Sequence, residues 1–213
     1  MCDSCGAETV VIVDDDDAVR DSLAALLHSV GLRTQSFATG TEFLSEWEPT
    51  GPTCMLLDVR MPGINGIALQ QRLRDMDAPV SAILMSAHGD IRTAVEGMRA
   101  GAVDFLQKPF RDQDVLDLVQ TQLEHSRKEW PEAMRRRAVR CRFELLTARE
   151  REVARRILRG QVNKVIAAEL GISIKTVEAH RTSLMRKLNV RNAAGLLADL
   201  LPVLGESLQP KDG

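Results

Sequence analysis

The sequence predicts an α/β domain built on a doubly wound parallel sheet, followed by a separate all-α domain. Up to about residue 125, short apolar runs without alternation are separated by segments with helical spacing. Such runs are typical of parallel strands that are buried on both faces. From residue 144 onward only helical spacing remains. With 213 residues, the chain is long enough for two domains of ordinary size.

Five strand–helix pairs are expected in the first domain. Short β-branched or apolar runs predict strands at 9–13, 32–37, 55–57, 80–85 and 103–106. Apolar residues at helical spacing predict helices at about 19–30, 40–47, 64–76, 90–100 and 112–123. Asp16 or Asp17 is placed to cap the first of these helices, and Asp90 the fourth.

The segment after the first domain is expected to be a linker. Pro131 should interrupt the helical pattern, and five arginines between residues 132 and 142 suggest a polar, partly helical connection. We consider a solvated charged surface as plausible for these arginines as a binding role. The predicted division is a domain at 8–125, a linker at 126–143, a second domain at 144–202 and a tail at 203–213.

The second domain is expected to contain four helices. Thr147 and Glu150 have the spacing of a capping box at the start of the first helix. Ser173 should cap the third helix, and the short turn at 170–173 joins it to the second as a helix-turn-helix. Asn192 begins the fourth helix, and Pro202 is expected to follow its end.

The charge is divided unevenly between the two domains. Residues 1–125 carry 9 Lys and Arg against 20 Asp and Glu, whereas residues 126–213 carry 19 against 10. This suggests a cation as partner for the first domain and nucleic acid for the second. Neither a signal peptide, a membrane span nor a disulfide framework is recognisable, which predicts a cytoplasmic protein without membrane contact. Cys2 and Cys5 have metal-site spacing, but no second ligand pair completes a site.

Polar side chains are predicted to meet at one edge of the sheet. Asp14 and Asp15 follow the first strand, Asp58 the third, Ser86 the fourth and Lys108 the fifth. Ligands of open α/β sheets bind outside the carboxyl ends of the strands. Carboxylates packed together repel each other, and Mg²⁺ with its preference for carboxylate and phosphate oxygens would relieve the conflict. The alternative is a solvated acidic turn, which we favour for the next two aspartates, Asp16 and Asp17.

Four motifs in the first domain carry a resemblance to a known family. The segments Val13-Asp14-Asp15, Leu57–Gly63, Met85–Asp90 and Lys108-Pro109-Phe110 resemble those of the receiver domain of two-component response regulators. The resemblance implies the flavodoxin-like strand order 2-1-3-4-5. It also implies a cis bond between Lys108 and Pro109.

The same resemblance assigns roles to individual residues. Asp58 would accept a phosphoryl group from a sensor histidine kinase. Mg²⁺ or Mn²⁺ would be held by Asp14, Asp15, Asp58 and the backbone carbonyl of Arg60. Lys108 would pair with the phosphoryl oxygens and Ser86 would be the switch hydroxyl. Phe105 stands at the position of the switch aromatic residue, where many relatives have tyrosine.

Four segments in the second domain, 146–150, 163–167, 172–180 and 187–188, carry a second resemblance. They resemble the LuxR-type helix-turn-helix of the NarL/FixJ regulators, which implies DNA binding and dimerisation through the last helix. On the third helix, Val177, Leu184 and Leu188 mark the core face. The opposite face should enter the major groove, and it carries Lys175, Ala179, Thr182 and Arg186.

Further residues complete the predicted DNA interface. Glu178 and Ser183 flank the groove face, and Glu178 can accept a hydrogen bond from cytosine. Arg181 lies nearer the core, which predicts a phosphate contact or a salt bridge. Candidates for phosphate contacts that position the domain without specifying sequence are Asn163, Lys164 and Lys187, and Thr176 belongs to the same interface.

The sequence therefore predicts a response regulator in which phosphorylation of Asp58 switches dimerisation and DNA binding. The expected partners are a sensor histidine kinase, a double-stranded promoter, a second copy of the chain and, as a further candidate, RNA polymerase. Turnover of a substrate as an enzyme is not expected, because no second catalytic motif accompanies Asp58. The competing hypotheses are a phosphorylation-independent adaptor with constitutive DNA binding, a phosphotransferase or phosphatase, and an RNA-binding protein.

Overall fold

A computed structural model describes residues 6–87 and 91–204. The chain divides into two compact units, Met1–Ala133 and Met134–Gly213, and each unit is described by itself. Cys2, Cys5, the residues 88–90 that include the expected cap Asp90, and residues 205–213 of the predicted tail lie outside the described residues.

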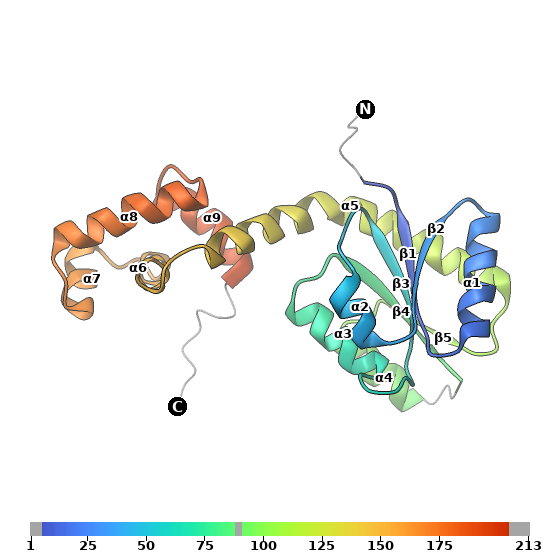
Figure 1. The fold of residues 1–213 in the computed structure, drawn as a ribbon. Coiled ribbons are helices and arrows are strands. Elements are labelled where there is room, and N and C mark those ends of the chain that lie inside the picture. Colours follow the sequence, from blue (N-terminus) through green and yellow to red (C-terminus); the bar gives the residue numbers. More distant parts are fainter. Residues whose placement is uncertain (1–5, 88–90, 205–213) are drawn as a thin grey trace. The chain divides into compact units, whose positions relative to one another are not determined.

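The first unit is built on a five-stranded parallel sheet (Figure 1). Its strands are β1 (Thr9–Val13), β2 (Arg33–Phe37), β3 (Thr53–Asp58), β4 (Val80–Ser86) and β5 (Asp104–Gln107). The order is β2-β1-β3-β4-β5, which confirms the predicted topology. Strands β3 and β4 extend one residue beyond the predicted ends, because Asp58 pairs with Met85 and Ser86 pairs with Gln107. All these strand ends therefore lie at one edge of the sheet.

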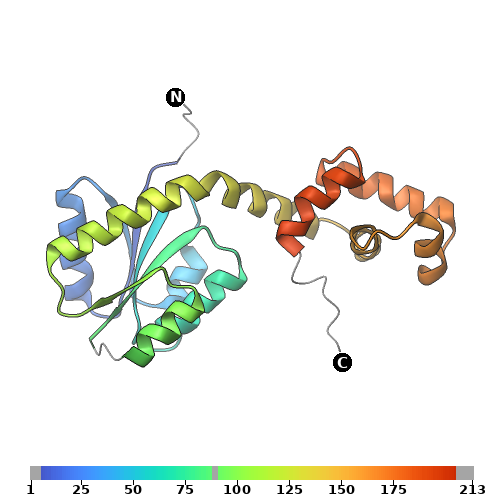
Figure 2. The same ribbon diagram turned by 180° about the vertical axis from the view of Figure 1, so that it is seen from behind.

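Helices cover both faces of this sheet (Figures 1 and 2). The helices are α1 (Asp17–Ser29), α2 (Gly40–Glu46), α3 (Gly66–Asp75), α4 (Ile91–Ala100) and α5 (Asp112–Glu144). Alternate strand residues point to opposite faces, so Ile12 packs with residues of α1 and α5, whereas Val13 packs with residues of α2 and α3. Two aliphatic cores thus fix the sheet edge from both sides.

The local start signals of the helices behave as the sequence predicts. The Asp16 carboxylate accepts hydrogen bonds from the backbone N–H groups of Ala18 and Val19, and so caps α1. In the second unit, Thr147 and Glu150 form the predicted capping box, and Ser173 caps the third helix of the predicted four. These short-range contacts could be predicted because both partners lie within four residues of each other.

Helix α5 differs from the prediction, because it continues through Pro131 to Glu144. A proline removes one helical hydrogen bond and crowds the preceding turn. Tertiary contacts on both sides of Pro131 outweigh this cost. Before it, the Ser126 hydroxyl accepts a hydrogen bond from the buried Thr53 N–H. After it, Val139 and Phe143 are buried in the core of the second unit. The expected partly helical linker is therefore helical up to Glu144.

Up to residue 204, the second unit consists of the end of α5 and four further helices. These are α6 (Ala148–Leu158), α7 (Asn163–Leu170), α8 (Ile174–Leu188) and α9 (Ala193–Leu204). Gly171 has a φ of 65°, a left-handed conformation that lets the chain turn sharply from α7 into α8. Val177, Leu184 and Leu188 lie in the core as predicted. Helix α9 extends past the predicted stop at Pro202. In the described part of the chain, no helix is long and apolar enough to cross a membrane.

Candidate functional site

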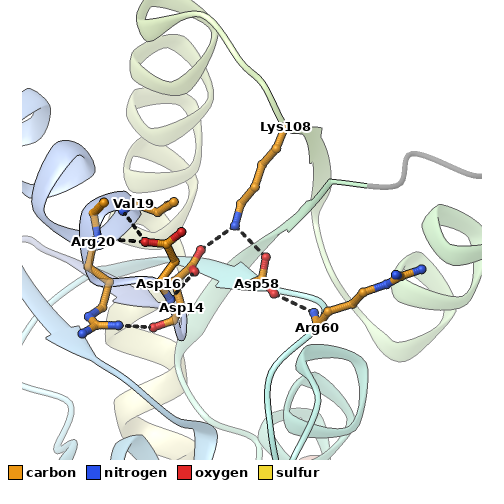
Figure 3. Close-up of polar contacts among 8 residues, drawn as sticks. Asp14, Asp16, Val19, Arg20, Asp58, Arg60 and Lys108 are labelled. Carbon is orange, nitrogen blue, oxygen red and sulfur yellow. Dashed lines mark hydrogen bonds and ion pairs between the residues drawn. The ribbon is translucent and has the colours of Figure 1, made fainter.

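Lys108 joins two buried carboxylates at the carboxyl edge of the sheet (Figure 3). Its ammonium nitrogen lies 2.7 Å from Asp14 Oδ2 and 2.7 Å from Asp58 Oδ1. Asp14 is 1% exposed and Asp58 is 6% exposed. The three residues come from positions 14, 58 and 108, so the parallel sheet brings together groups that are far apart in the sequence.

Backbone groups fix the remaining carboxylate oxygens. Asp58 Oδ2 accepts a hydrogen bond of 2.6 Å from the Arg60 N–H, and Asp14 Oδ1 accepts one of 3.1 Å from the Asp16 N–H. On the main-chain side, the Arg20 guanidinium donates to the Asp14 carbonyl at 2.6 Å. Both oxygens of each carboxylate therefore accept hydrogen bonds, and these bonds fix the orientation of the two carboxylates in advance.

Burial and neighbouring charges shift the pKa values of Asp58 and Lys108. Burial raises the pKa of Asp58, and the nearby Asp14 carboxylate adds to this, although hydrogen bonding to Lys108 opposes both. Burial acts to lower the pKa of Lys108, but its hydrogen bonds to Asp14 and Asp58 outweigh burial, so the pKa is raised. Lys108 thus stays charged and lies between two carboxyl groups that repel each other. A bound cation would relieve this repulsion.

The other predicted pocket residues lie around this pair. Asp15 is exposed, so the pocket has two converging carboxylates instead of the three expected from the sequence. Ser86 is 2% exposed, and its carbonyl accepts a hydrogen bond of 2.8 Å from the Lys108 N–H. Phe105 is half-buried and packs against the hydrophobic core on the face of the sheet that α2 and α3 cover. The Lys108–Pro109 bond is cis, as the resemblance implied.

The donor atoms of the pocket suit Mg²⁺ better than a softer metal. Among residues 6–87 and 91–204, no cluster of three His, Cys, Asp or Glu side chains is arranged around a common point. The described part of the chain therefore forms no three-carboxylate cage. Mg²⁺ does not need one, because it commonly binds one or two carboxylates and keeps several waters. Asp14 and Asp58 carry hard oxygen atoms of this kind, and the repulsion between the two carboxyl groups favours a cation.

Helix α8 presents a polar face to solvent in the second unit. The residues predicted for this face are all exposed: Lys175, Ala179, Thr182 and Arg186. Thr176 and Glu178, which were predicted to lie beside them, are exposed as well. On α7, Lys164 is exposed and Asn163 is half-buried. The helical periodicity of α8 therefore predicted its exposed face correctly.

Three further residues from the predicted DNA interface are bound to partners within the second unit. Arg181 donates to Asn163 Oδ1 at 2.9 Å and so joins α8 to α7. Lys187 lies 2.7 Å from the carboxylate of Glu150, and Ser183 also hydrogen-bonds to this carboxylate. Burial alone would raise the pKa of Glu150, but these bonds and those from Thr147 lower it to about 2. Ser183 and Lys187 therefore connect α8 to α6 through Glu150. Their proposed contacts with DNA stay predictions.

Comparisons with known proteins agree with this architecture. A family described as the response regulator receiver domain matches residues 10–120, more than half of the chain. A second, described as bacterial regulatory proteins of the luxR family, matches residues 144–198. The chain is a two-component response regulator of the NarL/FixJ type. It has a receiver domain, which contains the Asp58 pocket, and a LuxR-type DNA-binding domain, which contains α8.

The similarity to relatives extends over most of both chains. The regulator is 38% identical to the response regulator protein TmoT of Ectopseudomonas mendocina, over 88% of this chain and 86% of TmoT. It is 40% identical to the transcriptional regulatory protein FixJ of Azorhizobium caulinodans, over 88% of this chain and 89% of FixJ. Among solved structures, that of the response regulator StyR has a TM-score of 0.57 at 39% identity, covering 92% of this chain and 99% of StyR.

Two features of these sites were not recognised in the sequence. Arg20 was not singled out, although its position six residues after Asp14 and three after Asp17 places it one turn into a capped helix. Glu150 was recognised only as part of a capping box, because its partners Lys187 and Ser183 lie more than thirty residues away. Sequence spacing reveals partners on the same turn of a helix but not partners on another helix.

Proposed function

We propose that Asp58 of this regulator accepts a phosphoryl group from a sensor histidine kinase and thereby controls dimerisation and DNA binding. The observation that supports this most directly is the bridge from Lys108 to Asp14 and Asp58. It places a nucleophilic carboxylate next to a fixed positive charge at the open edge of the sheet. Phosphoryl transfer depends mainly on such positioning and on neutralisation of charge.

The proposed reaction is a direct transfer between two side chains. An oxygen of the Asp58 carboxylate attacks the phosphorus, an O–P bond forms, and the N–P bond to the kinase histidine breaks. The histidine nitrogen leaves with the electron pair of that bond. The hydrogen bond from the Arg60 N–H keeps one Asp58 oxygen directed, and Lys108 is placed to pair with the phosphoryl oxygens.

Mg²⁺ would be held by Asp14, Asp15 and Asp58 with the carbonyl of Arg60. When bound, it would neutralise part of the charge on the phosphoryl oxygens. Asp15 is exposed beside the pocket and is available to contact the ion through water. Turnover of a separate substrate is not part of the proposal, because Asp58 is itself the acceptor.

The switch would act through the ends of β4 and β5. Ser86 and Lys108 are already joined by the backbone hydrogen bond between these strand ends, and Ser86 is buried next to the pocket. A phosphoryl group on Asp58 would offer new acceptor oxygens to the Ser86 hydroxyl and to Lys108. Phe105, which lies between these two positions in sequence and is half-buried, can change its packing in response.

An apolar surface on α4 supports the proposed dimerisation. Ile91 is 84% exposed, and Val95 and Met98, which follow at helical spacing on the same side, are 43% and 48% exposed. Helix α4 packs against β5 and α3, next to the strands that carry Ser86 and Phe105. Three large apolar side chains on one exposed helix face form a suitable surface for a second copy of the receiver.

DNA binding would use the exposed face of α8 in the major groove of double-stranded DNA. Glu178 and Lys175 lie near the N-terminal end of α8, which is the part of a recognition helix that reaches base edges. Lys164 on α7 would contact a phosphate. A dimer places two such helices on paired half-sites and so raises affinity. At a promoter, the bound dimer would act on RNA polymerase.

Labelling with acetyl phosphate tests the proposed acceptor. The full chain is incubated with acetyl phosphate and Mg²⁺ and its intact mass is measured, followed by peptide mapping. One phosphoryl group on Asp58 is expected in the wild type, none in Asp58→Asn, and one in the matched control Asp21→Asn, which changes an exposed aspartate of α1. Unchanged labelling of Asp58→Asn would contradict the proposed acceptor.

A further inference from the structure

Arg20, in the first turn of helix α1, reaches back to the end of β1 and contacts the backbone of Asp14. Arg20 is mostly buried, with a side chain that is 15% exposed. One of its terminal nitrogens donates to the main-chain carbonyl of Asp14 at 2.6 Å, and the other contacts the carboxylate of Asp17. In Figure 3, Arg20 and Lys108 approach Asp14 from opposite sides. Asp14 is thus held between two cationic side chains.

The two contacts of Arg20 differ in their importance. Asp17 is 85% exposed, and an ion pair with an exposed carboxylate contributes little, because water and salt screen it. The carbonyl of Asp14 belongs to a residue that is 1% exposed. A buried carbonyl requires a donor, and a charged donor makes a stronger bond than a neutral one. The Asp14 contact should therefore account for most of the effect of Arg20.

The loop has a closed set of hydrogen bonds in which Arg20 takes part twice. Asp14 Oδ1 accepts from the Asp16 N–H, and the Asp16 carbonyl accepts from the Arg20 N–H at 3.1 Å. The Arg20 side chain then returns to the Asp14 carbonyl. These bonds fix the peptide that joins Asp14 to Asp15. That peptide determines which aspartate side chain enters the pocket and which remains exposed.

From this geometry we infer that Arg20 is a positioning residue for the cation site. It holds the backbone of Asp14 so that the Asp14 carboxylate faces Asp58 and Lys108 while the Asp15 carboxylate stays at the mouth of the pocket. This inference rests on the proposed function, since it takes Mg²⁺ as the cation bound there. Arg20 would affect the affinity for Mg²⁺ but would not take part in phosphoryl transfer itself.

The chemistry of arginine explains why lysine should not replace it. A guanidinium group has several donors in a fixed plane and can hold a carbonyl and a carboxylate together. An ammonium group at the end of a flexible four-carbon stem keeps the charge but not this geometry. Arg20→Lys therefore separates positioning from charge, and Arg20→Met removes both while keeping an unbranched side chain. Asp17→Asn is the matched control, because it weakens only the exposed contact.

Calorimetric titration of the full chain with Mg²⁺ alone tests the inference. We expect Arg20→Met and Arg20→Lys to bind Mg²⁺ about tenfold more weakly than the wild type, the effect of losing one charged hydrogen bond. Asp17→Asn should bind as the wild type does. Wild-type affinity in both Arg20 variants would overturn the inference, and so would an equal loss in Asp17→Asn. Absence of Mg²⁺ binding by the wild type would instead contradict the proposed function.

Labelling rates separate positioning from a general loss of structure. With acetyl phosphate, Arg20→Lys should need about tenfold more Mg²⁺ for half-maximal labelling of Asp58, and it should reach the wild-type rate at saturating Mg²⁺. A merely structural defect would lower the maximal rate as well, and this result would overturn the inference. Thermal unfolding of each variant without Mg²⁺ establishes that the receiver is folded in the titrations.

Discussion

Lys187 of α8 lies 2.7 Å from the carboxylate of Glu150 of α6, and Glu150 is only 4% exposed. This ion pair joins α8 to α6, the first helix that follows α5 in the DNA-binding domain. Residues on the inner side of α8 therefore hold the helix in place, while Lys175, Ala179 and Thr182, which are predicted to enter the major groove, lie on its exposed side.

The stability of the DNA-binding domain should depend on pH through Glu150. The pKa of Glu150 is about 2 in the folded domain, against 4.5 for the free side chain. Because folding depresses this pKa, the ionised carboxylate stabilises the domain fully above pH 4.5, and the stabilisation is lost as the pH falls from 4.5 toward 2. At pH 7, Lys187→Met should lower the free energy of unfolding by about 3 kcal/mol, since it leaves a buried charge without its partner.

Urea unfolding followed by circular dichroism measures this effect. The difference between wild type and Lys187→Met should be smaller at pH 3 than at pH 7. The control Lys164→Met, which changes an exposed lysine of α7, should have little effect at either pH. A difference for Lys187→Met that is the same at both pH values would show that Glu150 ionisation is not its cause.

Asp58→Asn should stabilise the receiver domain in the absence of Mg²⁺. Burial raises the pKa of Asp58, so the ionised form of this carboxyl group is less favourable in the folded domain than in the unfolded chain. Asparagine keeps an oxygen that can accept from Lys108 but carries no charge. The melting temperature at pH 7 in a chelator should therefore rise in Asp58→Asn and stay unchanged in Asp21→Asn. A lower melting temperature in Asp58→Asn would contradict the claim that the buried Asp58 charge destabilises the receiver domain.

Two substitutions should divide the DNA interface into reading and positioning contacts. Glu178→Ala should relax the preference for one base pair by about 1–3 kcal/mol, because it removes a group that accepts from a base. Lys164→Ala should weaken binding to all sequences alike and reduce the slope of log affinity against log salt by about 1. Binding to a panel of duplexes at several salt concentrations measures both. If Glu178→Ala weakened binding to all sequences alike and Lys164→Ala relaxed the base preference, the assignment of the two contacts would be wrong.

The apolar face of α4 should be required for dimerisation but not for phosphorylation. Val95→Asp places a charge in the centre of the face formed with Ile91 and Met98. Light scattering after size exclusion should show a monomer for this variant with acetyl phosphate and Mg²⁺, while Asp58 is still labelled. Val30→Asp is the matched control, because Val30 is 52% exposed at the end of α1. If Val95→Asp dimerised at the same protein concentration as the wild type, this face of α4 would not be the dimer interface.

Much of the receiver fold and its pocket could be predicted from the sequence. Asp58 and Lys108 stand at the ends of apolar strands, and the topology of a parallel sheet brings such ends together without further information. The orientation of Asp15 could not be predicted in this way. Adjacent residues after a strand share the same sequence signal, and only the hydrogen bonds of the loop, including those of Arg20, decide which one turns inward.

The second domain shows the same limit for helices. The spacing of Val177, Leu184 and Leu188 predicted which face of α8 is buried, because one helical period determines it. The partners of Lys187 and Arg181 lie on other helices and left no signal in the spacing. The extension of α5 past Pro131 was likewise missed, since it depends on side chains such as Phe143 that are buried by residues distant in the sequence.

Sedimentation velocity of the full chain tests the central claim most directly. The protein is measured with Mg²⁺, with and without beryllofluoride, which mimics the acyl phosphate on Asp58. The account predicts a shift from monomer to dimer on addition of beryllofluoride in the wild type and no shift in Asp58→Asn. A wild type that sediments identically in both conditions, or an equal shift in Asp58→Asn, would contradict the claim that phosphorylation of Asp58 drives dimerisation.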